Sequence, residues 1–597
     1  MRVNNLPRLT LMALSIAAIG HVSALYAADD GASEHRRGRH TLTPIEHVIV
    51  IMGENHTFDN VYGGYRPPRG QSVRNLLSQG IINADGSPGP NFSKAAQQQA
   101  SNPNLYMLDP LQTGPYATLP QPNTTYATGQ TPGVPDPRFP ADLPNGPFQI
   151  TKYVSYDAHV GDPVHRFFQM WQQHDKGRND LFPWVAETVG VGPQNSSHIT
   201  PNNTYQGGLA MGFYNMSTGD APYFKALAED YAMSDNYHQS IMGGTGANFI
   251  AIVTGDVAYH NANGAADVPP ANQIENPNPQ AGTNNFYQQD GYGGGSYVNC
   301  ADASQPGVSA VLDYINGLPG EAFRGGNCAA GHYYLLNNYG LGYTATGQVK
   351  PLGANIFTLP PQTLPTIADA LSDKDISWKW YSGGRNNGNP TGEYCSICDP
   401  LTGFTSVMTS SLKDNLQDVT QFYQDVLDEK SMPAVAFIRP FESMAGHPAN
   451  STMDGYENFV KDIISRVKGN KKLWAKTAIL ITMDEGGGYY DTGYIQPVDF
   501  FGDGTRIPMV VVSPFAKKGH VDHSYSDHAS ILKFIEKNWR LQPLSERSRD
   551  NLPNPVASAR DPYVPLNRPA VGDLMGMFSF EHAAENSRDQ VGHNDDK

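Results

Sequence analysis

The stretch His47-Val-Ile-Val-Ile-Met52 and its counterpart Thr477-Ala-Ile-Leu-Ile-Thr482, near the other end of the chain, decide the fold. Both are short, apolar and rich in β-branched residues without alternation, which is typical of strands buried on both faces of a parallel sheet. Glu54-Asn55 follows the first run, and Asp484-Glu485 follows the second. Because ligands gather at the carboxyl ends of parallel strands, we expect these four side chains to meet around a hard cation.

Further segments alternate between strand and helix. Residues 456–467 and 529–539 repeat apolar side chains at helical spacing, and residues 508–513 form another apolar strand-like run. Strand-like sequence also occurs at residues 376–381 and 434–438. The alternation predicts an α/β fold with a largely parallel central sheet flanked by helices.

The domain organisation follows from where these signals stop. Residues 1–28 have the basic start, apolar middle and small-residue end of a secretory signal peptide. We expect a single catalytic domain over residues 44–545, with Gly-, Pro- and Asn-rich loop insertions at about 65–149 and 256–364. Residues 546–597 read as a polar C-terminal tail.

The overall charge narrows the range of partners. The chain has 597 residues and a formal net charge of −16. A protein of this balance has no electrostatic reason to bind nucleic acid or an anionic membrane. We therefore expect no nucleic-acid partner and no stable membrane anchor, and the localisation that the signal peptide predicts is periplasmic or extracellular. The oligomeric state cannot be derived from the sequence.

The cysteines predict disulfides, because an exported chain meets an oxidising compartment. Proximity favours pairing Cys300 with Cys328 and Cys395 with Cys398. Four cysteines allow three connectivities, and the Cys395–Cys398 spacing is also compatible with a redox role.

A glycine-rich segment between the two acidic pairs predicts a phosphate-binding turn. In residues 240–249, glycines surround the hydroxyl of Thr245, and a helix can begin just after them. Glycines let the backbone approach an anion, and the amides of a helix start favour negative charge. Thr245 becomes a nucleophile if a cation withdraws charge from its hydroxyl, and Asn248 is placed to donate to a phosphoryl oxygen.

Taken together, these motifs resemble the bacterial phosphoesterases that include phospholipases C and acid phosphatases, within the alkaline phosphatase superfamily. The resemblance rests on several blocks in the same order, with the two insertions outside them. These blocks are residues 45–60, 243–248, 482–491, 513–519 and 526–536. It implies an alkaline-phosphatase-like fold.

The resemblance also implies the site. The metal ligands would be Glu54, Asn55, Thr245, Asp484 and Glu485. Thr245 would form a covalent phosphothreonine that water hydrolyses. The metal is one or more divalent ions of unknown identity, since oxygen ligands suit Ca²⁺, Mg²⁺ or Mn²⁺ and do not exclude Zn²⁺.

Histidines in the family-like blocks are the remaining candidates. His165 and His447 are expected to act in catalysis, and His523 and His528 to contact the substrate. The chain departs from the family at Asp491-Thr492, where a histidine often follows the aspartate.

The sequence therefore predicts a secreted, metal-dependent phosphoester hydrolase, of the phospholipase C type acting on phospholipid head groups. An acid phosphatase acting on phosphomonoesters is the alternative, because the loops that shape the pocket decide between diester and monoester. A secreted binding protein that has lost catalysis is a rival of another class. The five intact residues of the expected metal site argue against that rival.

Overall fold

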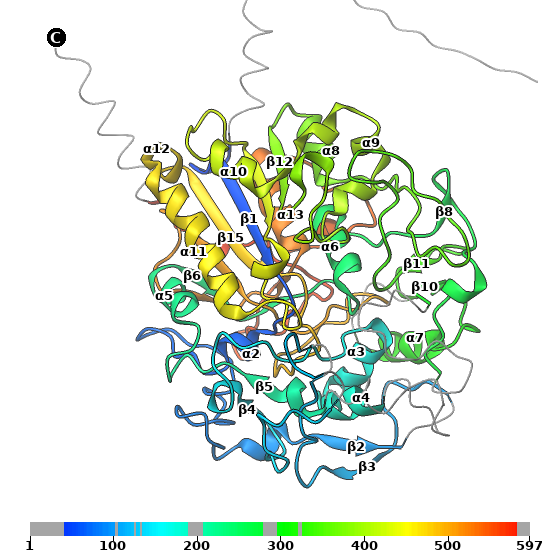
Figure 1. Ribbon diagram of the computed structural model, residues 1–597, viewed down its shortest axis with the longest axis vertical. Coiled ribbons are helices and arrows are strands. Elements are labelled where there is room, and N and C mark those ends of the chain that lie inside the picture. Colours follow the sequence, from blue (N-terminus) through cyan, green and yellow to red (C-terminus); the bar gives the residue numbers. More distant parts are fainter. Residues whose placement is uncertain are drawn as a thin grey trace, which may run out of the picture. The chain divides into compact units, whose positions relative to one another are not determined.

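The strand β1 (His47–Gly53) lies inside an eight-stranded sheet, as the first apolar run predicts. The computed structural model describes residues 41–101, 105–124, 127–131, 134–188, 207–278, 295–319 and 325–581, so the expected signal peptide at 1–28 lies outside it. In sheet order the strands are β13 (Leu416–Asp418), β12 (Trp378–Ser382), β14 (Val435–Arg439), β1, β15 (Thr477–Met483), β16 (Met509–Val512), β6 (Ala232–Ser234) and β17 (Val521–Asp522) (Figure 1).

The strand directions confirm the largely parallel sheet. β1 runs parallel to both of its neighbours, β14 and β15. β16 alone is reversed, since it pairs antiparallel with β15 on one side and β6 on the other. The apolar run at 508–513 thus forms a buried strand of the opposite direction, which periodicity cannot distinguish from a parallel one.

Helices cover the sheet, and every residue of β1 and β15 is buried. α11 (Met453–Gly469) contacts α5 (Pro222–Asp230) and passes in front of the central strands in Figure 1. α6 (Thr245–Thr254) contacts both α8 (Ile367–Ser372) and α13 (Ala529–Trp539). Burial on both faces explains why the central strands have no polar alternation.

The register of β1 against β15 brings the two acidic pairs to the same edge. Gly53 lies opposite Met483, the last residue of β15. The Asp484 amide then donates to the Gly53 carbonyl at 2.9 Å. Glu54-Asn55 and Asp484-Glu485 therefore leave neighbouring strands side by side.

Shorter elements surround the sheet. Between β1 and α6 along the chain lie α2 (Phe58–Tyr62), β2 (Gln98–Ala100), β3 (Gln112–Pro115), β4 (Phe148–Gln149), α3 (Phe167–His174), α4 (Phe182–Thr188), β5 (Gly212–Phe213) and β7 (Tyr237–His238). Later come β8 (Asn261–Ala262), β9 (Ala265–Ala266), β10 (Tyr297–Val298), α7 (Val308–Gly317), β11 (Tyr334–Leu335), α9 (Thr405–Met408), α10 (Val419–Asp425), α12 (Lys471–Trp474) and β18 (Ser526–Asp527).

The C-terminal segment differs from the expected polar tail. Leu574, Met577 and Phe578 are buried in the same apolar cluster as the sheet. The Phe578 ring stacks on Phe534 of α13, with ring centroids 5.0 Å apart. These residues lie in short irregular structure, so they carry no helical or strand period that the sequence could reveal.

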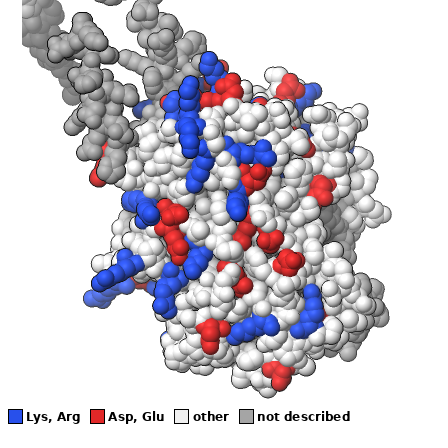
Figure 2. All heavy atoms as spheres, turned by 60° about the vertical axis from the view of Figure 1, so that its left-hand side comes forward, with Lys and Arg blue, Asp and Glu red and all other residues white. Residues whose placement is uncertain are grey.

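Two disulfides join Cys300 to Cys328 and Cys395 to Cys398, which is the pairing that proximity favours. Of the helices in the described ranges, none is both long and apolar enough to span a bilayer. On the face shown in Figure 2, basic and acidic side chains lie next to one another, without an extended area of one charge.

Candidate active site

Three buried oxygens at the carboxyl edge of the sheet have no hydrogen-bond partner among the described residues. They are Asn55 Oδ1, Asp484 Oδ2 and Glu485 Oε2. All three residues are fully buried. Orphaned buried oxygens are costly, and carboxylate and amide oxygens are the ligands that hard divalent cations prefer. The residues at this edge therefore fit a divalent metal ion.

The rest of each side chain is held in place by the neighbouring backbone. Asp484 Oδ1 accepts from the amides of Glu485 at 2.7 Å and Asn55 at 3.3 Å. Asn55 adopts a left-handed backbone with φ of 64°, a conformation that asparagine tolerates better than most residues. The Asn55 Nδ2 donates to Asp162 Oδ1 at 3.3 Å, so the Asn55 Oδ1 faces away from Asp162.

Glu54 belongs to the same edge but has a cation of its own. Its Oε1 accepts from Arg439 Nε at 3.0 Å and also from Nη2 of the same guanidinium. Arg439 Nη2 pairs in addition with Glu442 at 2.9 Å. The Sγ of Cys398 lies 3.2 Å from Glu54 Oε1, and because it is in a disulfide it neither donates a proton nor serves as a thiolate ligand.

The electrostatics at Asp484 and Glu485 are unfavourable without a cation. Burial, and then repulsion from Glu54, raises the pKa of Asp484 well above its usual range. Burial and the charge of Asp484 raise the pKa of Glu485 in the same way. A bound divalent ion would reverse both effects, since its charge favours the ionised carboxylates.

Thr245 lies at the start of α6, beside Glu485. Its Oγ1 donates to Glu485 Oε1 at 3.1 Å. The turn before it requires glycine, because a Cβ on Gly243 would lie 1.8 Å from the Leu336 carbonyl oxygen. The structure thus brings Thr245 together with the acidic pairs, as the sequence predicts.

His165 and His447 lie at the same site, on either side of Asp162. His165 Nδ1 is 2.7 Å from the Pro163 carbonyl, which can only accept, so Nδ1 carries a proton and Nε2 has a lone pair when the ring is neutral. That Nε2 is 3.9 Å from Glu485 Oε1. His447 Nε2 is 3.8 Å from Asp162 Oδ2.

The side chains of three predicted substrate contacts, Asn248, His528 and His523, have hydrogen-bond partners within the protein. Asn248 uses its amide group to hold the glycine turn, accepting from the Ile241 amide at 3.0 Å and donating to carbonyls of the same turn. His528 is fully buried, with Nε2 3.2 Å from the Met483 carbonyl. His523 pairs with Asp235 at 2.6 Å, and among the described residues its side chain has no hydrogen bond or ion pair with the five expected metal ligands. That Asn248, His528 and His523 contact the substrate therefore stays a prediction.

Sequence reasoning missed Asp162 and Arg439. Asp162 lies in the same Gly-Asp-Pro-Val-His block as His165, and proximity to that histidine was an available signal. Arg439 ends β14, the other neighbour of β1, so the strand-end rule that selected Glu54 applies to it as well. Arg439 is cationic and cannot bind a metal ion, so the pattern of oxygen ligands at strand ends does not indicate it.

The sequence profile of the Phosphoesterase family matches residues 45–542. The chain belongs to the Phosphoesterase family. This finding confirms the resemblance that the motifs indicate. Within the family match lie all of the residues described at the carboxyl edge, from Glu54 to Glu485.

Relatives in this family carry two kinds of name. The chain is 22% identical to the hemolytic phospholipase C of Pseudomonas aeruginosa over 91% of this chain and 57% of the relative. It is 25% identical to the non-hemolytic phospholipase C of Burkholderia pseudomallei, over 90% of this chain and 60% of the relative. A phosphate-repressible acid phosphatase of Penicillium chrysogenum is 29% identical over 34% of this chain and 48% of the relative. The chain thus spans less than two thirds of each of these relatives.

Among solved structures, a protein in the alkaline phosphatase superfamily from Vibrio parahaemolyticus has a TM-score of 0.25 at 9% identity, covering 53% of this chain and 60% of that chain. A similarity of this size carries no weight for the function.

Proposed function

We propose that this protein is an exported, metal-dependent hydrolase of phosphoric esters that works through a phosphothreonine at Thr245. The observation that carries the proposal is the contact of the Thr245 hydroxyl with Glu485, at 3.1 Å, beside orphaned oxygens of Asn55, Asp484 and Glu485. A nucleophile hydrogen-bonded to a carboxylate that would also bind a metal ion is an arrangement that phosphoryl transfer can use.

Glu54, Asn55, Thr245, Asp484 and Glu485 would hold the metal. When bound, it lowers the pKa of the threonine hydroxyl and neutralises charge on the phosphate. Glu485 orients the Thr245 hydroxyl through their hydrogen bond. The N-terminus of α6 presents backbone amides to phosphate oxygens.

In the first step the Thr245 oxygen bonds to phosphorus, its proton passes to the Glu485 Oε1 that it contacts, and the bond from phosphorus to the leaving alcohol breaks. The leaving oxygen takes a proton from the protonated ring of His165 or His447, both of which are held beside Asp162. In the second step water gives a proton to that histidine, now neutral, and its oxygen bonds to phosphorus while the bond from phosphorus to Thr245 breaks. Thr245 takes its proton back from Glu485.

For the substrate, we propose a phosphodiester of the phospholipid head-group type. The support is that relatives named phospholipase C align over 90% and 91% of this chain, whereas the relative named acid phosphatase aligns over 34%. Phosphomonoesters remain the second candidate because that shorter alignment has the higher identity, 29%.

We further infer one catalytic domain over residues 44–545, in line with the family match at 45–542, and an export signal at 1–28. The burial of Phe578 in the main core extends the ordered structure beyond residue 545. An oxidising compartment outside the cytoplasm suits the two disulfides.

The test is turnover by the mature protein with p-nitrophenylphosphorylcholine and with p-nitrophenyl phosphate, before and after chelation. We expect the diester to be preferred, chelation to abolish turnover, and a divalent ion to restore it. Acid quenching during turnover should leave phosphate on the peptide that contains Thr245.

The matched control is Thr254→Ala, which removes a threonine hydroxyl from the other end of the same helix, where it bonds the Ile250 carbonyl at 2.8 Å. That variant should retain activity, whereas Thr245→Ala should not. Preference for the monoester would make the protein a phosphatase. Turnover that ignores both chelation and Thr245, or no turnover at all, would overturn the proposal, and the latter would favour a binding protein.

A further inference from the structure

His523, which the sequence predicts as a substrate contact, is hydrogen-bonded within a group of polar residues apart from the expected metal ligands. Its Nδ1 is 2.6 Å from Asp235 Oδ1, and its Nε2 is 3.1 Å from Ser72 Oγ. Asp235 is fully buried, the His523 side chain is 22% exposed, and Ser72 is exposed. The three side chains therefore form a chain of hydrogen bonds that runs from the interior to the surface.

Asp235 is fixed as an acceptor. Its Oδ2 accepts from the Arg74 amide at 2.7 Å and from the Tyr563 hydroxyl at 2.7 Å, which leaves Oδ1 for His523. Because a carboxylate can only accept, the proton of His523 lies on Nδ1, and the Nε2 lone pair faces the Ser72 hydroxyl. Burial lowers the pKa of His523, but the hydrogen bond and charge of Asp235 outweigh it and raise the pKa.

We propose that Ser72 and His523, positioned by Asp235, form a second hydrolytic site, which cleaves accessible carboxylic esters through an acyl-serine. Serine hydrolases on unrelated folds share this chain of hydrogen bonds from serine to histidine to carboxylate. It is defined by the geometry of the three side chains and not by their positions in the sequence. No Gly-x-Ser-x-Gly turn surrounds Ser72, so this site does not correspond to the α/β-hydrolase type.

The reaction balances within these residues and water. Ser72 Oγ bonds to the carbonyl carbon as its proton moves to His523 Nε2. The bond to the leaving alcohol then breaks, and that alcohol takes the proton from His523. Water, deprotonated by His523, releases the acid and restores Ser72. The Val73 amide, which has no acceptor within the described ranges, is the donor next to Ser72 in the chain, whereas the Arg74 guanidinium is paired with Asp561 at 3.3 Å and lies over the Tyr563 ring.

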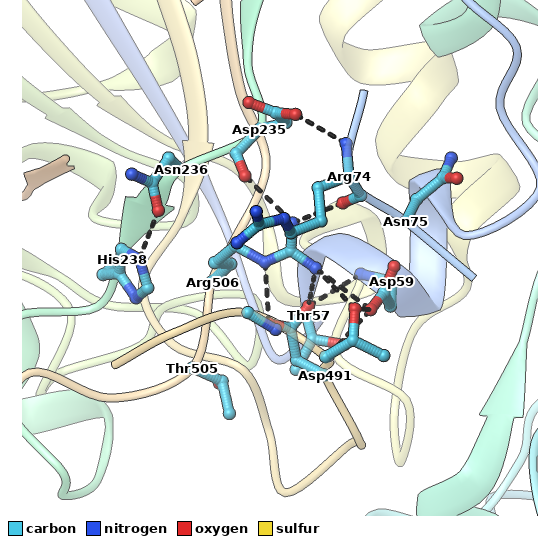
Figure 3. A network of polar contacts seen from close by, with 12 residues as sticks. Thr57, Asp59, Arg74, Asn75, Asp235, Asn236, His238, Asp491, Thr505 and Arg506 are labelled. Carbon is cyan, nitrogen blue, oxygen red and sulfur yellow. Dashed lines mark hydrogen bonds and ion pairs between the residues drawn. The ribbon is translucent and has the colours of Figure 1, made fainter. Parts of the chain in front are cut away.

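The second site is independent of the metal site. Arg506, which donates to the Asp235 carbonyl at 2.9 Å and the Arg74 carbonyl at 2.6 Å, also donates to Asp491 and Asp59, which are not among the expected metal ligands (Figure 3). In the part of the chain that the structure describes, none of the side-chain hydrogen-bond partners of Ser72, His523 or Asp235 is one of the five expected metal ligands. The ester cleavage should therefore survive chelation and the loss of Thr245.

The experiment is covalent labelling of the full chain in the Thr245→Ala background with a fluorophosphonate, with peptide mass spectrometry to locate the adduct, alongside p-nitrophenyl acetate hydrolysis. We expect the adduct on Ser72, with or without chelator. Ser72→Ala should abolish labelling and ester hydrolysis, and His523→Gln should slow labelling about a hundredfold, the usual contribution of a general base.

The matched control is Ser524→Ala, an exposed serine adjacent to His523, which should label as fast as the parent. Asp235→Asn should lower the maximal labelling rate while leaving the half-saturating probe concentration unchanged, which separates positioning from a loss of the surface. Thermal midpoints verify that each variant is folded. An adduct on another residue, or no adduct on folded protein, would reduce the three residues to a structural tether.

Discussion

Two buried acidic clusters in this chain differ in how their charge is balanced. At the first, made of Glu54, Asp484 and Glu485, Glu54 is paired with Arg439, but no arginine or lysine among the described residues pairs with Asp484 or Glu485. At the second, the Arg506 guanidinium contacts Asp491 with Nε at 2.8 Å and Nη2 at 3.0 Å, and Asp59 with Nη2 at 3.0 Å (Figure 3). Both clusters are fully buried.

The difference separates a site from a brace. Carboxylates that are paired with a fixed guanidinium are satisfied and need nothing further. Carboxylates whose outer oxygens are orphaned create a demand for positive charge, which a divalent ion can meet. The departure at Thr492 fits the second cluster, because its amide and hydroxyl both donate to Asp59, at 2.8 Å and 2.6 Å.

The largest expected effect tests whether the first cluster serves chemistry. Thr245→Ala should lower kcat by at least about a thousandfold, because the nucleophile is lost. Thr245→Ser should retain measurable turnover, since it keeps the hydroxyl beside Glu485. The measurement is steady-state hydrolysis of p-nitrophenylphosphorylcholine, and near-parental activity of the alanine variant would show that the cluster is not catalytic.

The next effect tests the second cluster as a brace. Arg506→Met should lower the free energy of unfolding by about 3–5 kcal/mol, because it leaves buried carboxylates without their partner. Arg466→Met is the control, since its pair with Asp462 is exposed and such pairs contribute below about 1 kcal/mol. Urea denaturation measures both. Equal losses would end the distinction between the two clusters.

A smaller effect concerns the metal. A divalent ion at one hundred times its Kd should stabilise the parent by about 2.7 kcal/mol. Asp484→Asn should abolish this gain without lowering metal-free stability, because asparagine keeps the Oδ1 that accepts two amides and removes a disfavoured charge. Thermal unfolding with and without Mn²⁺ tests it, with Asp313→Asn on the exposed face of α7 as control.

The smallest effect is a pH dependence of the free energy of unfolding at His238, on which the charges of Asp491 and Arg506 from the second cluster act. Burial lowers the pKa of His238 to about 3, so the folded state takes up its proton later than the unfolded state does as the pH falls. Its contribution is therefore fully present above pH 6.5 and is lost as the pH drops towards 3. Between pH 7 and pH 5 the free energy of unfolding of the parent should fall by about 2 kcal/mol more than that of the His238→Gln variant. Urea denaturation of both proteins at pH 7 and pH 5 measures the two losses of unfolding free energy, and equal losses would contradict the prediction.

The sequence could predict the parts of the fold that repeat a local rule. The apolar runs of β1 and β15 specify strands buried on both faces, and because the ends of these neighbouring strands meet, the residues after them are the expected metal ligands. The direction of β16 could not be predicted, because an apolar run is the same in either direction.

The candidate site shows the same limit at the level of side chains. Thr245 followed from its glycines and the helix after it, but the direction of the Asn248 amide depends on the turn closing back on Ile241. The link from Ser72 through His523 to Asp235 joins three distant segments, and no local pattern around any of them indicates it. Long-range partners of this kind require the folded chain.

The pairing of β1 with β15 and β14 has a consequence for biosynthesis. The first strand of the sheet, at residues 47–53, has no neighbour until the chain has been made as far as residues 435–483. Such distant pairing delays folding until synthesis is nearly complete. The two halves of the metal site come from these same distant segments, so no ligand set exists on the nascent chain. In the proposed function, an ion can therefore meet the full ligand set only after the chain has been made beyond residue 485.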